Sequence, residues 1–207
     1  AQGEGPYRLG GFSGTSIVLF ALAKLFEANG DQVVQLLIVD HFPLLFTSAL
    51  YVPDDESIKQ RSPSTHSIRH TLKSAVALYR ASNQQHQRIA DHLDDAIEGR
   101  PTLPYMERWY KTFFDILFMA YDFLFDLVPI CEPFTMAAAR RVLIEWMKDL
   151  KAPVTASFAS GGILSLEAAG PLRIDGGVHE VFPSATIVEV EATHFSIFES
   201  ATLVDLI

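Results

Sequence analysis

Residues 7–40 read YRLGGFSGTSIVLFALAKLFEANGDQVVQLLIVD and decide the fold class of the chain. Residues 7–11 are extended in character and end in two glycines, and residues 16–28 are apolar on nearly every side, which is typical of a buried helix. The Asn-Gly pair at 29–30 ends that helix, because both residue types accept a left-handed backbone. Residues 33–39, VVQLLIV, then predict a strand that is covered on both faces. A strand, a helix and a second strand form a βαβ unit, so we expect an α/β protein.

The chain changes character after this unit. Loop signals come first, and apolar residues then recur at helical spacing in four runs, at residues 67–82, 84–97, 104–128 and 136–150. Strand patterns return at residues 153–158 and 186–190, and a helical segment at 197–207 closes the chain. We therefore expect a mostly parallel sheet with flanking helices, in which residues 42–150 form a large helical insertion.

Composition excludes several classes of protein. The chain has 207 residues, 49% of them hydrophobic, which is enough for one folded domain without a structural metal or disulfides. Cys131 is the single cysteine and cannot form an internal disulfide, so we expect a cytoplasmic location. The net charge of -9 argues against a nucleic acid or an anionic membrane as partner. The most apolar stretch, residues 111–130, carries three aspartates that would be costly in a bilayer, so we expect no membrane span.

A serine stands at the turn between the first strand and the first helix. In GFSGT, residues 11–15, the turn would hold Ser13 with its Oγ exposed, as in a nucleophile elbow. Gly14 begins the helix, where its N–H can face a developing oxyanion. Thr15 replaces the last glycine of the usual G-x-S-x-G, and we expect its branched side chain to crowd the strand at a cost of about 1 to 3 kcal/mol. The alternative is a Gly/Ser-rich turn without a nucleophile.

A serine nucleophile needs a histidine base and a carboxylate that orients it. Asp40 follows the strand 33–39 at the edge of a parallel sheet where active sites assemble, beside the strand that delivers Ser13. His194 lies between the last strand and the last helical segment, where such a base belongs. Asp175 is kept as a reserve acid. The ordinary alternatives are a loop or capping role for Asp40 and a solvated or capping role for His194.

These residues resemble the type I thioesterase domains of polyketide synthases and nonribosomal peptide synthetases, which belong to the α/β-hydrolase superfamily. The resemblance rests on GPYRLGGFSG at 5–14, LLIVD at 36–40 and ATHFSIFE at 192–199. It implies a Ser13, His194 and Asp40 triad, with the Gly14 N–H in the oxyanion hole. The substrate would be an acyl chain on the phosphopantetheine of an acyl or peptidyl carrier domain of the same synthase. Its release would be hydrolysis, lactonisation or a Claisen-type cyclisation.

The resemblance also bears on cofactors and on the insertion. It implies no cofactor bound by this chain, and no third ligand joins His66 and His70 at a known metal-site spacing, so we expect no metal. The insertion would be a lid over the acyl chain. Aromatic residues crowd one of its predicted helices, either as packing between lid helices or as the lining of an apolar chamber; the candidate substrate-binding residues are Trp109, Phe114, Phe118 and Tyr121.

Two other functions stay open. One is a discrete serine esterase or lipase-like hydrolase that acts on free esters, and the other is a non-catalytic α/β-hydrolase domain that binds a ligand, which Thr15 makes conceivable. Several strands precede the nucleophile in this superfamily. The resemblance therefore implies that residues 1–207 are a thioesterase domain without its leading strands and without the second oxyanion donor. Homodimerisation is left open.

Overall fold

The computed structural model describes residues 5–49, 65–81, 84–98, 112, 115, 118–120, 122–129, 134–166, 169, 172 and 174–206. The chain divides into two compact units. One consists of residues 1–48 and 143–207, and the other of residues 49–142.

The first unit contains a four-stranded parallel sheet, which confirms the α/β fold. Its strands lie in the order β1-β2-β3-β4, and every neighbouring pair is parallel. The strands are β1 (Tyr7–Phe12), β2 (Val33–Val39), β3 (Val154–Gly161) and β4 (Thr186–Thr193).

The register of the sheet brings the strand ends together. Phe12, the last residue of β1, pairs with Val39, the last residue of β2, so Ser13 and Asp40 follow side by side at one edge. Gly161 at the end of β3 pairs with Thr193 at the end of β4, which places His194 at the same edge. The parallel register therefore gathers residues from opposite ends of the chain.

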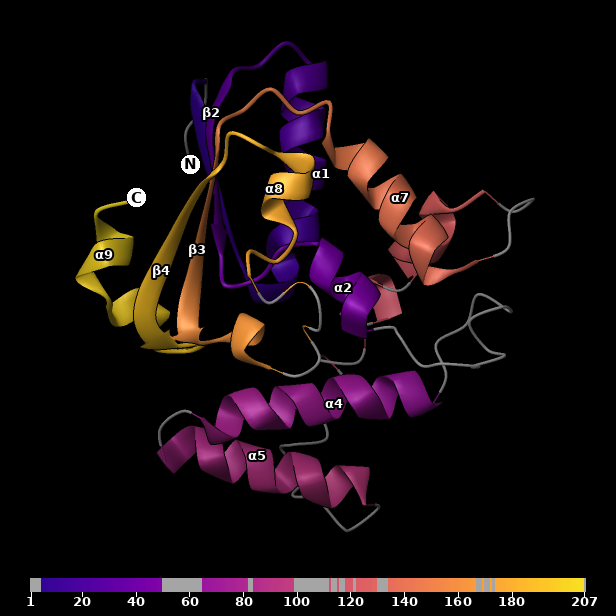
Figure 1. The fold of residues 1–207 in the computed structure, drawn as a ribbon, viewed down its shortest axis with the longest axis vertical. Helices are drawn as coiled ribbons and strands as arrows, with labels where there is room; N and C mark the ends of the chain where they lie inside the picture. The colour runs from indigo at the N-terminus through magenta and orange to yellow at the C-terminus, as the bar shows by residue number, and fades with distance from the viewer. Residues whose placement is uncertain are drawn as a thin grey trace. The chain divides into compact units, whose positions relative to one another are not determined.

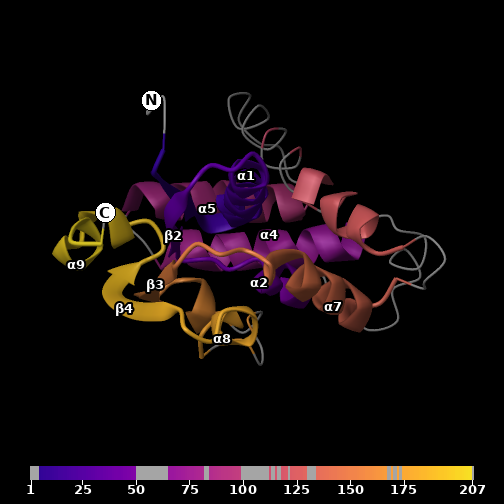
Figure 2. The same cartoon turned by 90° about the horizontal axis from the view of Figure 1, so that it is seen from above.

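Helices cover both faces of this sheet. The long helix α1 (Ser16–Ala28) and the short α8 (Val178–Val181) lie on one face, and α9 (Ala201–Val204) lies on the other, as Figures 1 and 2 show. On the α1 face, Phe20 is fully buried and stacks on Phe182, with 5.8 Å between ring centroids. The core on the α9 face is formed by Leu37, Val39, Ala159, Val190, Ile197 and Leu203.

Short elements connect these layers. A 3-10 turn, η1 (Ser13–Thr15), leads from β1 into α1, and α2 (Leu44–Ala49) follows β2. The remaining connecting elements are η2 (Ile163–Ser165), η4 (Ile197–Glu199) and α7 (Met136–Met147), which crosses from one unit into the other. The predicted helix at 197–207 is thus two short helical turns, η4 and α9, separated by Ser200 in extended conformation.

The described part of the second unit is mainly helical. Its helices α4 (Thr65–Arg80) and α5 (Gln84–Ile97) confirm the two helices predicted there, and an ion pair joins Arg80 to Asp94. They pack through a buried cluster of Leu72, Val76, Ala90 and Leu93. Residues 122–127 are also helical, whereas much of the predicted helix 104–128 lies outside the described residues. In the described part of the chain, no helix has the length and apolar character that a membrane crossing requires.

Candidate active site

The turn that holds Ser13 is strained. Ser13 has a φ of 53°, in the left-handed region that residues with a side chain rarely adopt. Strain of this kind collects at functional sites, where the surrounding structure holds it in place. Gly11 allows the turn, because a Cβ there would lie 3.1 Å from Cβ of Leu19 in α1. The sharp strand-to-helix turn predicted from GFSGT is therefore present.

Thr15 does not crowd the strand, which corrects the expectation from its branched side chain. Its φ of −70° and ψ of −6° are ordinary helical values, and the residue is exposed. Its Oγ1 donates a hydrogen bond of 2.6 Å to the carbonyl oxygen of Phe12. The close approach between helix and strand occurs at Gly11, so a threonine is tolerated at position 15.

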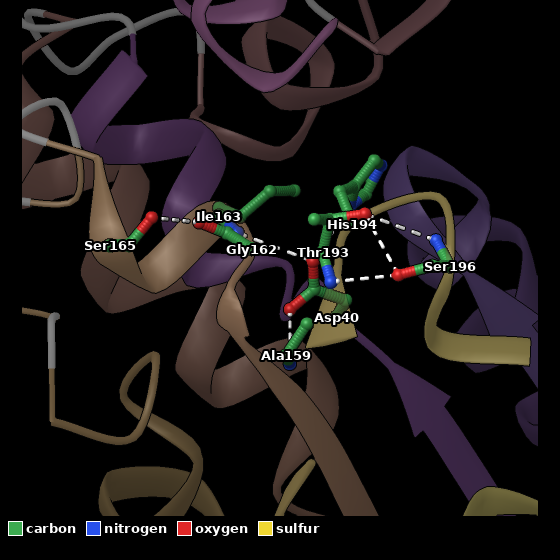
Figure 3. A network of polar contacts seen from close by, with 8 residues as sticks. All are labelled: Asp40, Ala159, Gly162, Ile163, Ser165, Thr193, His194 and Ser196. Atoms are coloured by element: carbon green, nitrogen blue, oxygen red, sulfur yellow. Dashed lines mark hydrogen bonds and ion pairs between the residues drawn. The ribbon is translucent and has the colours of Figure 1, made fainter. Parts of the chain in front are cut away.

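Asp40 is fully buried and held by backbone donors. It also has a left-handed φ, of 52°. Its Oδ1 accepts a hydrogen bond of 2.8 Å from the Ala159 N–H, and its Oδ2 accepts one of 3.2 Å from the Ile163 N–H. Between these donors, a Cβ at Gly162 would lie 2.1 Å from Asp40 Oδ2, so only glycine fits. The carboxylate is thereby fixed in one orientation (Figure 3).

His194 completes a buried acid and base pair. Its Nδ1 lies 2.6 Å from Asp40 Oδ2, and its side chain is 4% exposed. Because a carboxylate only accepts hydrogen bonds, we assign the proton to Nδ1, which leaves the lone pair of Nε2 free to accept a proton. The loop is locked on either side of His194, since the Thr193 N–H donates to Ser196 Oγ at 2.9 Å and the Ser196 N–H to Thr193 Oγ1 at 3.2 Å (Figure 3).

The residue before Ser13 contacts the imidazole. The Phe12 ring stacks on His194 with 4.6 Å between centroids, and Phe198 packs edge-on against Phe12 at 4.9 Å. The structure thus brings Asp40 and His194 into a hydrogen bond and places Ser13 next to the aromatic ring that touches His194. Ser13 Oγ itself makes no hydrogen bond within the described part of the chain, and Gly14 lies at the helix start, where N–H groups have no helical partner.

Asp175 has a different role from the reserve acid that the sequence allowed. Its carboxylate accepts hydrogen bonds from the Gly177 and His179 N–H groups and lies 3.1 Å from His179 Nδ1. It therefore organises the turn that leads into α8.

The remaining candidates are only partly described. Trp109, Phe114 and Tyr121 lie outside the described residues, as do the side chains of His66 and His70, whereas Phe118 is helical and 36% exposed. Across the described residues, no group of three or more histidine, cysteine or acidic side chains could hold a metal.

A second histidine at the site was not predicted. His41 directly follows Asp40, is 7% exposed, and its Nδ1 lies 3.0 Å from Oγ of Ser16, which is fully buried in α1. Burial, and to a smaller extent the neighbouring His194, lower the pKa of His41 to about 3. The sign of His41 in the sequence is its position at the end of the predicted strand, directly after Asp40. Nothing in the local pattern showed that it is buried.

Comparison with known proteins gives one informative similarity. No protein-family model matches the chain. The chain is 32% identical over 209 residues to a protein of Strobilurus tenacellus described as the highly reducing polyketide synthase stpks1. The match takes in 96% of this chain but only 7% of that protein. The chain is thus similar, over nearly all of its residues, to a short segment of a much larger synthase.

Proposed function

We propose that the chain is a chain-releasing serine thioesterase domain, in which Ser13 takes an acyl chain from the phosphopantetheine thioester of a carrier domain. The observation that carries this proposal is the buried hydrogen bond of 2.6 Å between His194 Nδ1 and Asp40 Oδ2, at the sheet edge where Ser13 occupies a strained turn. An oriented histidine beside a serine on such a turn is the arrangement that nucleophilic acyl transfer needs. The similarity to a polyketide synthase supports a polyketide-like acyl chain as substrate.

The mechanism follows from the roles of these side chains. Ser13 Oγ attacks the thioester carbonyl carbon while His194 Nε2 takes its proton, and the carbonyl electron pair moves onto oxygen. The Gly14 N–H stabilises this oxyanion. The C–S bond then breaks, and the imidazolium returns its proton to the departing sulfur. Asp40 stabilises the imidazolium and holds its orientation without being protonated.

Release of the chain repeats the same steps with a second nucleophile. Water, activated by His194, would give a free acid, a hydroxyl group of the chain would give a lactone, and a carbanion would give a Claisen-type ring. No cofactor takes part in any of these routes. The carrier domain would be the protein partner.

The test uses a small fluorophosphonate on the protein, followed by mass spectrometry of the adduct. We expect the adduct on Ser13, its loss in Ser13→Ala, and its retention in Ser184→Ala, a matched change at an exposed serine. An unmodified Ser13 would overturn the proposal in favour of a binding domain.

Turnover is then compared for pantetheine thioesters and for oxoesters of the same acyl group. Activity confined to oxoesters would favour a free-standing esterase.

A further inference from the structure

His41 lies against the elbow that holds Ser13. Its ring packs edge-on against Phe46, with 4.5 Å between centroids. The Cζ atom of the same Phe46 is the nearest neighbour of a Cβ built on Gly14, at 3.5 Å. The His41 imidazole therefore packs against a ring that lies close to Gly14, the proposed oxyanion donor.

The hydrogen bond from Ser16 fixes the tautomer of His41. Ser16 is fully buried, and in the described part of the chain its hydroxyl has no acceptor except His41 Nδ1 at 3.0 Å. A buried hydroxyl proton without an acceptor is costly, so the Ser16 O–H donates to Nδ1. The proton of a neutral His41 ring then resides on Nε2. Because burial keeps the pKa of His41 near 3, this neutral form prevails at any pH near neutrality.

The Nε2–H group of His41 has no hydrogen-bond partner among the described residues. Ser157 Oγ is the one side-chain polar atom among the described residues that is fully buried and has no partner. His41 Nε2 is therefore unpartnered without being sealed from solvent. A fixed, neutral N–H donor close to a nucleophile can stabilise developing negative charge without giving up its proton.

We propose that His41 donates a hydrogen bond through Nε2–H to the acyl carbonyl oxygen during attack by Ser13, and so acts with the Gly14 N–H as an oxyanion donor. This inference rests on the proposed function. His41 keeps its proton throughout the reaction: the Ser13 proton passes to His194 and then to the departing sulfur, and His41 contributes only the hydrogen bond. Ser16 is a positioning residue that sets the tautomer of His41.

Two amide substitutions separate the nitrogens of His41. In His41→Asn, the amide lies near the position of Nδ1, so contact with Ser16 is kept and the outer donor is lost. In His41→Gln, the amide reaches the position of Nε2, so the outer donor is kept. His41→Phe fills the site without any donor and replaces the Asn variant if that variant does not fold. His179→Asn is the matched control, because His179 is an exposed histidine bound to Asp175.

The measurement is the rate of Ser13 phosphonylation by a small fluorophosphonate, with thermal unfolding as the check on folding. The phosphoryl oxygen takes the place of the oxyanion. We expect His41→Asn and His41→Phe to slow labelling by about 10²- to 10³-fold, as loss of an oxyanion donor does. His41→Gln should stay within about tenfold of the wild type, and His179→Asn should match the wild type.

Three outcomes would overturn the inference. Equal slowing by Asn and Gln would show that His41 serves packing alone, and unchanged rates in Asn and Phe would show that its N–H contributes nothing. If the wild type forms no adduct on Ser13, the proposed function fails and this inference fails with it. That result differs from the first two, in which the wild type reacts.

Discussion

Gly162 is the residue on which the orientation of Asp40 depends. A methyl group there would lie 2.1 Å from Asp40 Oδ2, so Gly162→Ala must displace either the carboxylate or the backbone that donates to it. We expect a loss of about 1 to 3 kcal/mol in the free energy of unfolding and at least a tenfold slower labelling of Ser13. Denaturant titration and fluorophosphonate kinetics measure the two effects.

Gly10→Ala is the matched control for this change. A Cβ at Gly10 would meet only the Leu37 carbonyl oxygen, at an ordinary 3.8 Å, so stability and labelling should both stay near wild type. Equal behaviour of the two alanine variants would contradict the fit described for Gly162.

His41 makes stability depend on pH. The unfolded chain takes up a proton on His41 near pH 6.5, whereas the folded chain does so only near pH 3, so the unfolded state binds more protons between these values. As pH falls through this window, the free energy of unfolding should drop by up to about 1.4 kcal/mol per pH unit more in the wild type than in His41→Asn. Denaturant titrations of both proteins between about pH 7 and about pH 4.5 provide the measurement. The lower limit is set at ~pH 4.5 because most carboxylates are still ionised there. Parallel curves would show that His41 is not buried in its neutral form.

At the scale of elements, local patterns predicted the units of secondary structure and missed the contacts between them. The bounds predicted for α1, β2 and α5 agree with the structure, because apolar periodicity and turn residues are local signals. The strands β3 and β4 run three residues further than predicted, where sheet pairing extends past the apolar run. Pairing is a property of two segments, so a single segment does not reveal it.

For the candidate site too, the sequence predicted individual residues but not the contacts that hold them in place. Chain order and the resemblance named Ser13, Asp40 and His194, and the structure brings Asp40 and His194 together. The donors that hold Asp40 come from Ala159 and Ile163, at 119 and 123 positions away in sequence. These donors are backbone N–H groups, so the identity of the residues that carry them does not reveal their role. The burial of His41 was invisible for the same reason, since it depends on α1 and on Phe46.

The helical insertion is expected, from the resemblance, to receive the acyl chain, and Phe118 tests this. Phe118 is 36% exposed on a helix of the second unit. Phe118→Ala should shift the preferred acyl-chain length in a competition between thioesters of different length, because it widens an apolar surface. Labelling of Ser13 by a small fluorophosphonate should not change. The neighbouring Met119→Ala, at a side chain that is 70% exposed, is the control. Equal loss of long-chain turnover and of labelling would count against a role in substrate selection.

Two of the buried clusters in the described part of the chain belong to different compact units. The cluster on the α9 face of the sheet and the cluster between α4 and α5 have no residue in common. Units with separate cores can unfold in separate steps, since cooperativity depends on shared packing. The three residues proposed for the chemistry, Ser13, Asp40 and His194, all lie in the first unit.

Two leucine truncations test this division. Leu203→Ala removes a side chain that is 1% exposed in the first core, and Leu93→Ala removes one that is fully buried in the second. Each should cost about 2 to 5 kcal/mol, but only in its own unit. Hydrogen exchange followed by mass spectrometry should therefore show faster exchange in β2 and β4 for Leu203→Ala, and in α4 and α5 for Leu93→Ala. Ser13 labelling should be slower only in the Leu203 variant under mild denaturant. Faster exchange across both units in either variant would show that the chain unfolds as one cooperative body, because the loss of a buried side chain would then be transmitted to packing that it does not touch.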